Sequence, residues 1–215
     1  MLPLLLLALA AAAAPAEGRQ LVDEVVAVVD AHSVTLSELA AETRIRLVEQ
    51  QGAQAASLPL DRSLLAASLR RLVEERVVLS EVERLKLFDL DRAEIDAAVA
   101  RLRSRFATPE EWDAFARELE LTDDEVGAIL ARELRVARYL DNRLKLAAQL
   151  RDSELEEAWK AQGSRGDREL LKQRLAKEKY ERLLTEVLGE LRRRAAVRIL
   201  DPLDGPDHSI TAGRP

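Results

Sequence analysis

The segments with strand character lie near opposite ends of this chain of 215 residues. Val25–Val29 and residues 33–36 are two short runs on either side of a turn at residues 30–32, and residues 197–200 form a third run. Their valines, isoleucine and threonine are residue types enriched in strands. A hairpin of two strands is marginally stable in water, and a third strand makes it more tenable. We therefore predict that the two ends of the chain meet in one small antiparallel sheet.

The chain between these runs is predicted to be helical. Several segments begin with a residue that can cap a helix, and an acidic residue often follows three positions later, as in a capping box. Apolar residues then recur at helical spacing, and the run after Asp61 is apolar on more than one side, which is typical of a central helix. The predicted N-caps are Thr35, Asp61, Asp91, Thr108 and Thr122, and further helices are predicted at 152–161 and 168–194. The predicted fold is mostly α with a small sheet.

Residues 1–16 differ in composition from the rest of the chain. Residues 2–14 are apolar apart from Pro3, and the small residues that follow resemble a signal peptidase site. The run is too short to span a bilayer as a helix, and no basic residue precedes it. The alternative is a buried N-terminal helix. We predict a signal peptide, a mature chain in the periplasm and no stable membrane insertion.

Composition argues against several kinds of chemistry. The formal net charge is -6, which disfavours nucleic acid as a partner because phosphate contacts need a basic surface. The chain has no cysteine, so disulfides, thiol chemistry and a cysteine-linked lipid are excluded. Its histidines, His32 and His208, fall in a predicted turn and near the C-terminus, and no glycine-rich phosphate loop occurs. We predict that the protein is not an enzyme and uses neither a cofactor nor a metal.

Five segments together resemble the SurA-like periplasmic chaperones. Val25–Val29 with residues 34–39 resembles the opening hairpin and first helix of that family. Residues 72–79 resemble its core helix, and residues 152–159 its linker helix. Residues 190–200 resemble its closing helix and strand. The resemblance covers nearly the whole mature chain and implies a helical chaperone core closed by a small sheet.

The chain departs from the family after the linker helix. Relatives normally carry one or two parvulin-type prolyl isomerase modules there, whereas this chain has only a short stretch around residues 163–167. We therefore predict one chaperone domain at 17–200, in which an N-terminal part at 21–162 is closed by residues 168–200. Residues 201–215 are rich in proline and glycine and are predicted to form a disordered tail.

The resemblance implies an ATP-independent holdase, which binds unfolded outer-membrane or other exported proteins, its clients, through exposed apolar surface rimmed by charge. One alternative is a dedicated envelope assembly subunit with one fixed protein partner. A less favoured alternative is a peptidyl-prolyl cis-trans isomerase, which is kept because relatives carry that activity. The short stretch after residue 161 also suggests a homodimer formed by exchange of the last helix.

Three aromatic residues are candidates for peptide binding. Phe106, Trp112 and Phe115 recur at helical spacing and could line a groove that grips apolar peptide. The same spacing is also typical of core packing. The basic run at residues 192–194 could attract acidic partners, although such a run more often complements the negative end of a helix.

Overall fold

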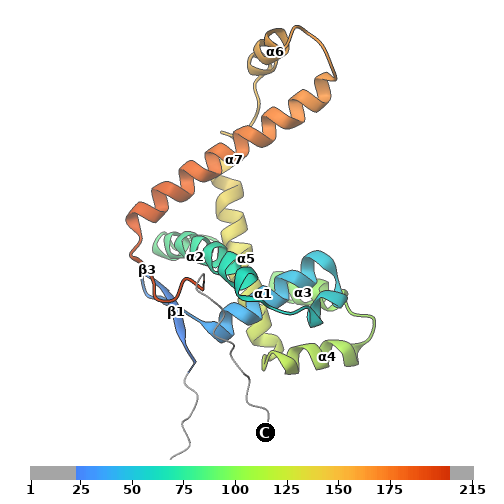
Figure 1. Ribbon diagram of the computed structural model, residues 1–215, viewed down its shortest axis with the longest axis vertical. Coiled ribbons are helices and arrows are strands. Elements are labelled where there is room, and N and C mark those ends of the chain that lie inside the picture. Colours follow the sequence, from blue (N-terminus) through green and yellow to red (C-terminus); the bar gives the residue numbers. More distant parts are fainter. Residues whose placement is uncertain (1–22, 204–215) are drawn as a thin grey trace, which may run out of the picture.

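The computed structural model describes residues 23–203 (Figure 1). The predicted signal peptide at 1–16 and residues 204–215 of the predicted tail lie outside this range. Helices dominate the described residues and a small antiparallel sheet accompanies them, which confirms the predicted fold class. In chain order the elements are β1 (Val25–Val29), β2 (His32–Thr35), α1 (Leu36–Gln51), the 3₁₀ helix η1 (Ala53–Ser57), α2 (Arg62–Arg84), α3 (Arg92–Arg103), α4 (Pro109–Glu118), α5 (Asp123–Leu144), α6 (Asp152–Ala161), α7 (Arg168–Arg194) and β3 (Val197–Ile199).

The sheet joins the two ends of the chain as predicted. Its strand order is β2-β1-β3, and both pairings are antiparallel. Ala27 lies opposite Ile199 and Val29 opposite Val197. The hairpin turn is shorter than predicted, because His32 already belongs to β2. Asp30 has a φ of 50°, in the left-handed region that aspartate tolerates better than most residues, and this lets the turn close.

The Asp30 carboxylate joins this turn to two other elements. One oxygen accepts a hydrogen bond from the Ser80 hydroxyl of α2 at 2.6 Å, and the other accepts from the Ala196 amide at 2.7 Å. The Asp30 amide in turn donates to the Ala196 carbonyl at 2.9 Å. The bond from Ser80, followed by the bond from Ala196, lowers the pKa of Asp30. The ionised carboxylate therefore stabilises the junction of hairpin, α2 and β3.

Replacement of this carboxylate should weaken the fold moderately. We expect Asp30→Asn to lower the free energy of unfolding by about 1 kcal/mol at neutral pH, a small value because the site is exposed to water. Because the folded-state pKa is lowered, the stabilisation is present above the unfolded-state pKa and disappears as the pH falls through the folded-state value. Urea unfolding at neutral and acidic pH measures both effects. Asp89→Asn, in the loop before α3, is the control, and an equal loss there would contradict the assignment.

Most helix starts follow the predicted capping chemistry. The Asp91 and Thr122 side chains form complete capping boxes with Glu94 and Glu125. The box predicted at Thr35 and Glu38 is only half formed. The Thr35 hydroxyl accepts from the Glu38 amide, but the Glu38 carboxylate accepts from Arg76 of α2 at 2.8 Å. A contact between helices has replaced the local one.

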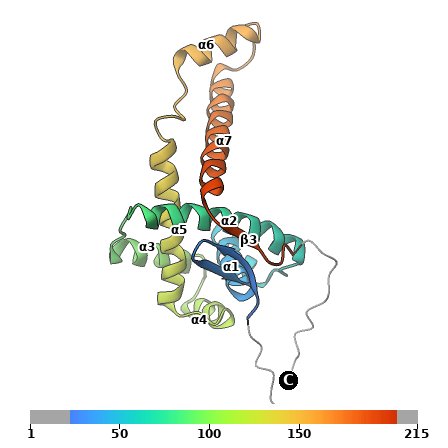
Figure 2. The ribbon, with the colours of Figure 1, turned by 90° about the vertical axis from the view of Figure 1, so that its left-hand side faces the viewer.

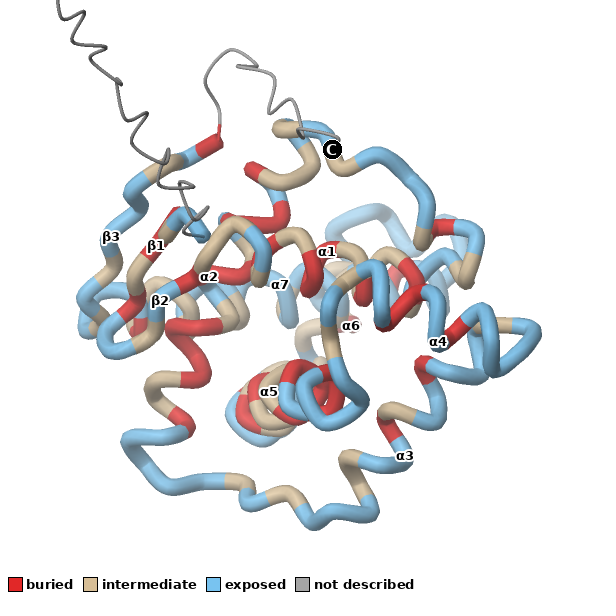
Figure 3. Tube along the Cα trace, turned by 90° about the horizontal axis from the view of Figure 1, so that it is seen from below, coloured by how far each residue is buried: buried red, intermediate tan, exposed pale blue. Residues whose placement is uncertain are grey.

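We name residues 23–144 and 181–203 the body. Two apolar clusters form its interior. The first combines the sheet with the start of α1, with α2 and with the second halves of α5 and α7, and it includes Val26, Leu39, Leu72 and Val78. The second combines α1, α3, α4 and α5. Figure 3 shows buried residues of β1, α1 and α2 within the body. Because α2 buries residues along most of its length, it is the central helix that its wide apolar surface predicted.

The first half of α7 leaves the body together with α6 and forms a projecting arm (Figures 1 and 2). We define the arm as residues 145–180. Leu155 of α6 and Leu171 of α7 are both buried, although neither belongs to the two clusters of the body. The Lys179 ammonium donates to the Gln149 carbonyl and to the Glu154 carboxylate, each at 2.8 Å. These contacts hold α6 against α7 outside the body.

Residues 201–203 are the part of the predicted disordered tail that the structure describes, and they contact the rest of the fold. Leu203 is buried in the first cluster, and its amide donates to the Asp201 carboxylate at 2.8 Å. Asp201 also lies 3.6 Å from the Arg62 guanidinium at the start of α2. Burial of the Leu203 side chain attaches residues 201–203 to the first cluster.

Candidate binding surface

Open grooves flank α7 where it crosses α2. One has a volume of about 350 Å³, and Val77 of α2 lines it together with Leu184 and Leu188 of α7. The other has a volume of about 560 Å³ and contains the exposed Leu85 and Leu87, which follow α2. Charged residues also line both grooves. They are Glu74 and Arg192 in the first and Glu81, Arg143, Glu190 and Arg194 in the second.

A further groove, which we name the inner groove, lies between the body and the arm. Its volume is about 460 Å³. Leu130, Leu134 and Leu140 of α5 provide apolar lining, and Tyr180 of α7 lines it from the arm. The remaining lining residues, several of them charged, are Arg46 and Glu49 of α1, Glu75 of α2, Ala98 and Arg101 of α3, and Glu133, Val136, Ala137 and Asp141 of α5. The inner groove thus combines apolar and acidic side chains from five helices.

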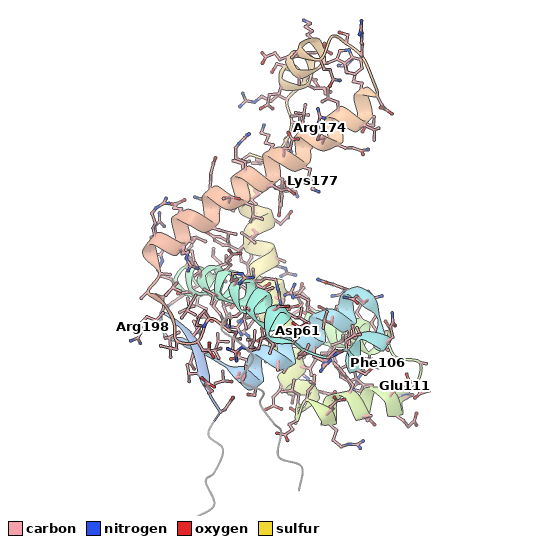
Figure 4. The ribbon with its side chains drawn as sticks, in the orientation of Figure 1. Asp61, Phe106, Glu111, Arg174, Lys177 and Arg198 are labelled. Atoms are coloured by element: carbon pink, nitrogen blue, oxygen red, sulfur yellow. The ribbon has the colours of Figure 1, made fainter. Side chains whose placement is uncertain are left out.

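The arm carries large apolar side chains that remain in contact with water. Leu146 is 80% exposed, Leu170 is 63% exposed and Tyr180 is 41% exposed. Charged residues lie along α7 as well, and Figure 4 shows Arg174 and Lys177 on this helix within the arm. Arg174 lies 3.7 Å from Glu178, one turn further along α7. Apolar surface bordered by charge can bind a partner while the protein stays dissolved.

A buried ion network that sequence reasoning missed joins α1, α2 and α5. Glu42 is 2% exposed and Arg76 is 3% exposed, and Arg76 donates to Glu42 at 2.6 Å. Arg76 also donates to Glu38, and Arg132 of α5 contacts both carboxylates. Burial alone would lower the pKa of the Arg76 guanidinium, but Glu42 and Glu38 outweigh that effect and raise it. The signal in the sequence was a charged residue inside the apolar face of each helix.

A second ion network borders the inner groove. The Arg46 guanidinium donates to Glu133 at 2.6 Å and to Glu75 at 2.9 Å, and Glu75 also accepts from Arg71. Burial raises the pKa of Glu133 to about 7, against the opposing effect of Arg46, and the nearby carboxylates of Glu49, Glu75 and Glu42 raise it further. Burial likewise raises the pKa of Glu49. Arg46 is thus shared between two carboxylates, and Glu75 is shared between Arg46 and Arg71.

The three predicted peptide-binding aromatics do lie together, but they belong to the core. The ring centres of Phe106 and Phe115 are 5.0 Å apart, and those of Phe106 and Trp112 are 5.7 Å apart. Trp112 is 3% exposed and Phe115 is 4% exposed, both within the second cluster. Figure 4 labels Phe106, which is only partly buried, between α3 and α4. The prediction of a peptide-gripping groove is corrected, because these side chains fill the space between α3, α4 and α5.

Other residues considered from the sequence have structural partners. The His32 ring nitrogen lies 2.9 Å from a Glu83 carboxylate oxygen, a partner that the sequence did not reveal, whereas His208 lies outside the described residues. In the basic run at residues 192–194, Arg194 pairs with Glu190 one turn earlier. Within residues 23–203 no group of three or more acidic or histidine side chains could hold a metal ion. No helix in the described range is long and apolar enough to cross a membrane.

The chain was compared with known proteins by sequence. No model of a protein family matches it, and no curated protein sequence matches it either. The resemblance to SurA-like chaperones therefore stays a prediction. The function has to be inferred from the grooves and the arm themselves.

Proposed function

We propose that this protein is an ATP-independent chaperone that holds unfolded exported or outer-membrane proteins in the periplasm. The observation that carries the proposal is the apolar surface left open beside α7, from the grooves at α2 to Leu146 and Leu170 on the arm. The charged residues that share these grooves support the same proposal, because charge beside apolar surface limits self-association. The export signal and the family resemblance, both inferred from sequence, add the location and the class of client.

The energetics of such a surface suit reversible capture. Burial of ~600 Å² of apolar area at ~25 cal/mol per Å² gives a gross gain of ~15 kcal/mol. Association and ordering cost ~4 to 15 kcal/mol, which leaves weak to micromolar binding. A client held this weakly dissociates spontaneously, so that release requires no nucleotide.

Suppression of aggregation tests the proposal directly. An unfolded outer-membrane barrel protein is diluted from urea with and without the chaperone at equal molar ratio, and light scattering is recorded. We expect scattering to fall to less than half, and undiminished scattering would refute a holdase function. Capture of proteins from a periplasmic extract distinguishes a holdase from the alternative of an assembly subunit. A holdase should retain many different clients, whereas a subunit with a fixed partner should yield a single complex of constant stoichiometry.

Size-exclusion chromatography with light scattering gives the oligomeric state and so tests the predicted exchange of the last helix.

Polar replacements on the arm should weaken client capture without unfolding the protein. We expect the double variant Leu146→Ser with Leu170→Ser to need roughly three times more protein for the same suppression, because loss of about 0.7 kcal/mol of client contact from the two exposed leucines together weakens binding about threefold. Leu58→Ser with Leu200→Ser removes two exposed leucines from the body and is the matched control. Equal loss in both variants would show that the arm has no special role.

A further inference from the structure

We propose that the inner groove is a subsite for a lysine or arginine side chain of a client, next to an apolar residue that packs on α5. This proposal rests on the proposed function and names the kind of client segment that one groove selects. Apolar surface alone would accept any unfolded chain. The inner groove adds acidic groups at a defined place and can therefore discriminate between segments.

The apolar half of the subsite comes from α5 and α7. Leu134 and Leu140 of α5 line the groove, and the half-exposed ring of Tyr180 lines it from the arm. A leucine or aromatic side chain of a client would pack between them. Because side chains two positions apart in an extended chain lie on the same face, about 7 Å from each other, a basic residue two positions along the client can reach the acidic wall.

Charge complementarity identifies the second residue. The acidic groups that line the groove are Glu49, Glu75, Glu133 and Asp141, and the cationic groups are Arg46 and Arg101. Arg46 divides its two contacts between Glu75 and Glu133. Glu75 is also paired with Arg71, so that Arg46 is the ion-pair partner of Glu133, while Glu49 and Asp141 form no ion pair within residues 23–203. In this partly dry site an added positive charge is favourable and an added negative charge is not. A client cation at this place would complete the network.

The protonation state of Glu133 supports the same assignment and predicts a pH dependence. Burial raises the pKa of Glu133 to about 7, with Arg46 opposing and Glu49, Glu75 and Glu42 reinforcing the shift. Arg101 of α3 and Asp141 of α5 also line the groove, and Tyr180 lines it from α7. Glu133 loses its negative charge as the pH falls below this value, while a client lysine stays charged. Attraction for a cation should therefore be strong in mild alkali and weaker in mild acid.

The test compares three short fluorescent peptides that share one apolar sequence. At two positions they carry lysine in the first peptide, glutamate in the second and glutamine in the third. Fluorescence anisotropy with the full chain measures each Kd. Near pH 8 and at low salt we expect the lysine peptide to bind about tenfold more tightly than the glutamate peptide. The preference should fall to about threefold or less near pH 5.5, because Glu133 is then protonated.

Variants in which glutamates of the groove are replaced by glutamine show where the preference for lysine arises. Glu75→Gln with Glu133→Gln should reduce the lysine preference to about twofold or less and remove most of its pH dependence, with Glu49 left as the remaining groove carboxylate of raised pKa. Glu49→Gln, whose side chain forms no ion pair with any residue in 23–203, should reduce it about threefold without disturbing Arg46. Glu110→Gln with Glu118→Gln changes the net charge equally on exposed positions of α4 and should leave the preference unchanged.

The outcomes separate this subsite from the proposed function. Equal affinity for lysine and glutamate peptides, with aggregation still suppressed, would overturn the subsite and leave the holdase standing. The subsite would also be overturned if the preference for lysine were unchanged in the Glu75/Glu133 double variant and in Glu49→Gln, because the client cation would then bind outside the inner groove. Absence of peptide binding together with undiminished aggregation would overturn the proposed function and the subsite with it.

Discussion

A chain that ends at Ala195 is expected to unfold at a much lower urea concentration than one that ends at Leu203. The shorter chain loses β3, so that β1 keeps only one partner strand and the sheet becomes a bare hairpin. It also loses the buried Leu203 and the hydrogen bond from the Leu200 amide to the Val26 carbonyl. Regained chain entropy offsets part of this loss. We expect a net decrease of about 3 kcal/mol or more, a large fraction of the stability of a domain.

The chain that ends at Leu203 is the matched control, because it retains β3 and every contact of residues 196–203. Circular dichroism during urea titration compares the two chains. The point variant Arg198→Pro in the full chain gives an independent measure, since Arg198 lies opposite Val28 at a hydrogen-bonded position of the ladder and proline cannot donate that bond. Unfolding midpoints that agree for the two truncated chains would show that closure of the sheet contributes little.

Loss of the Arg76 guanidinium is expected to be comparably severe. Arg76→Met keeps much of the side-chain volume but leaves Glu42 buried with only Arg132 as a counter-ion. Removal of one partner from a buried ion pair typically costs about 3–5 kcal/mol, because the remaining charge is dehydrated and uncompensated. Since Arg132 stays in place, we expect about 3 kcal/mol by urea unfolding.

The double variant Arg76→Met with Glu42→Leu is the informative partner of that change. It removes both buried charges and leaves Arg132 paired with the half-exposed Glu38. We expect it to recover most of the lost stability and to lie within about 1 kcal/mol of the original protein. A double variant as unstable as the sum of the single variants would mean that the two residues contribute independently and that the ion pair has been assigned the wrong role.

The fold was predictable because local signals agreed with one another. Strand-forming residues occur at the two ends, and Asp91 and Thr122 begin helices with complete capping boxes. Such signals depend on a few neighbouring residues, which is why they could be read directly. The turn at Asp30 was misjudged by one residue because both lengths suit the same sequence. The burial of Leu203 was missed because it depends on a core built elsewhere in the chain.

The candidate surface was harder to predict, since it depends on how helices cross. Phe106, Trp112 and Phe115 have a spacing that fits a groove or a core equally, and only the packing of α3 and α4 against α5 decides for the core. The acidic wall of the inner groove combines Glu75 and Glu133, which are far apart in sequence. No spacing rule links such residues. The exposed apolar arm was likewise invisible, because its leucines repeat as regularly as those of a buried helix.

The pairing of β1 with β3 has a consequence for how the molecule is made. Asp30 and Ala196 are 166 positions apart, so β1 leaves the ribosome long before its partner strand β3 has been synthesised. Such distant pairing is entropically unfavourable at first and is associated with slow folding. Until β3 has been synthesised, the edge of β1 that pairs with it stays open, next to the apolar residues of β1. We therefore expect the chain to be bound by other proteins or degraded most easily while its own synthesis or transport is incomplete.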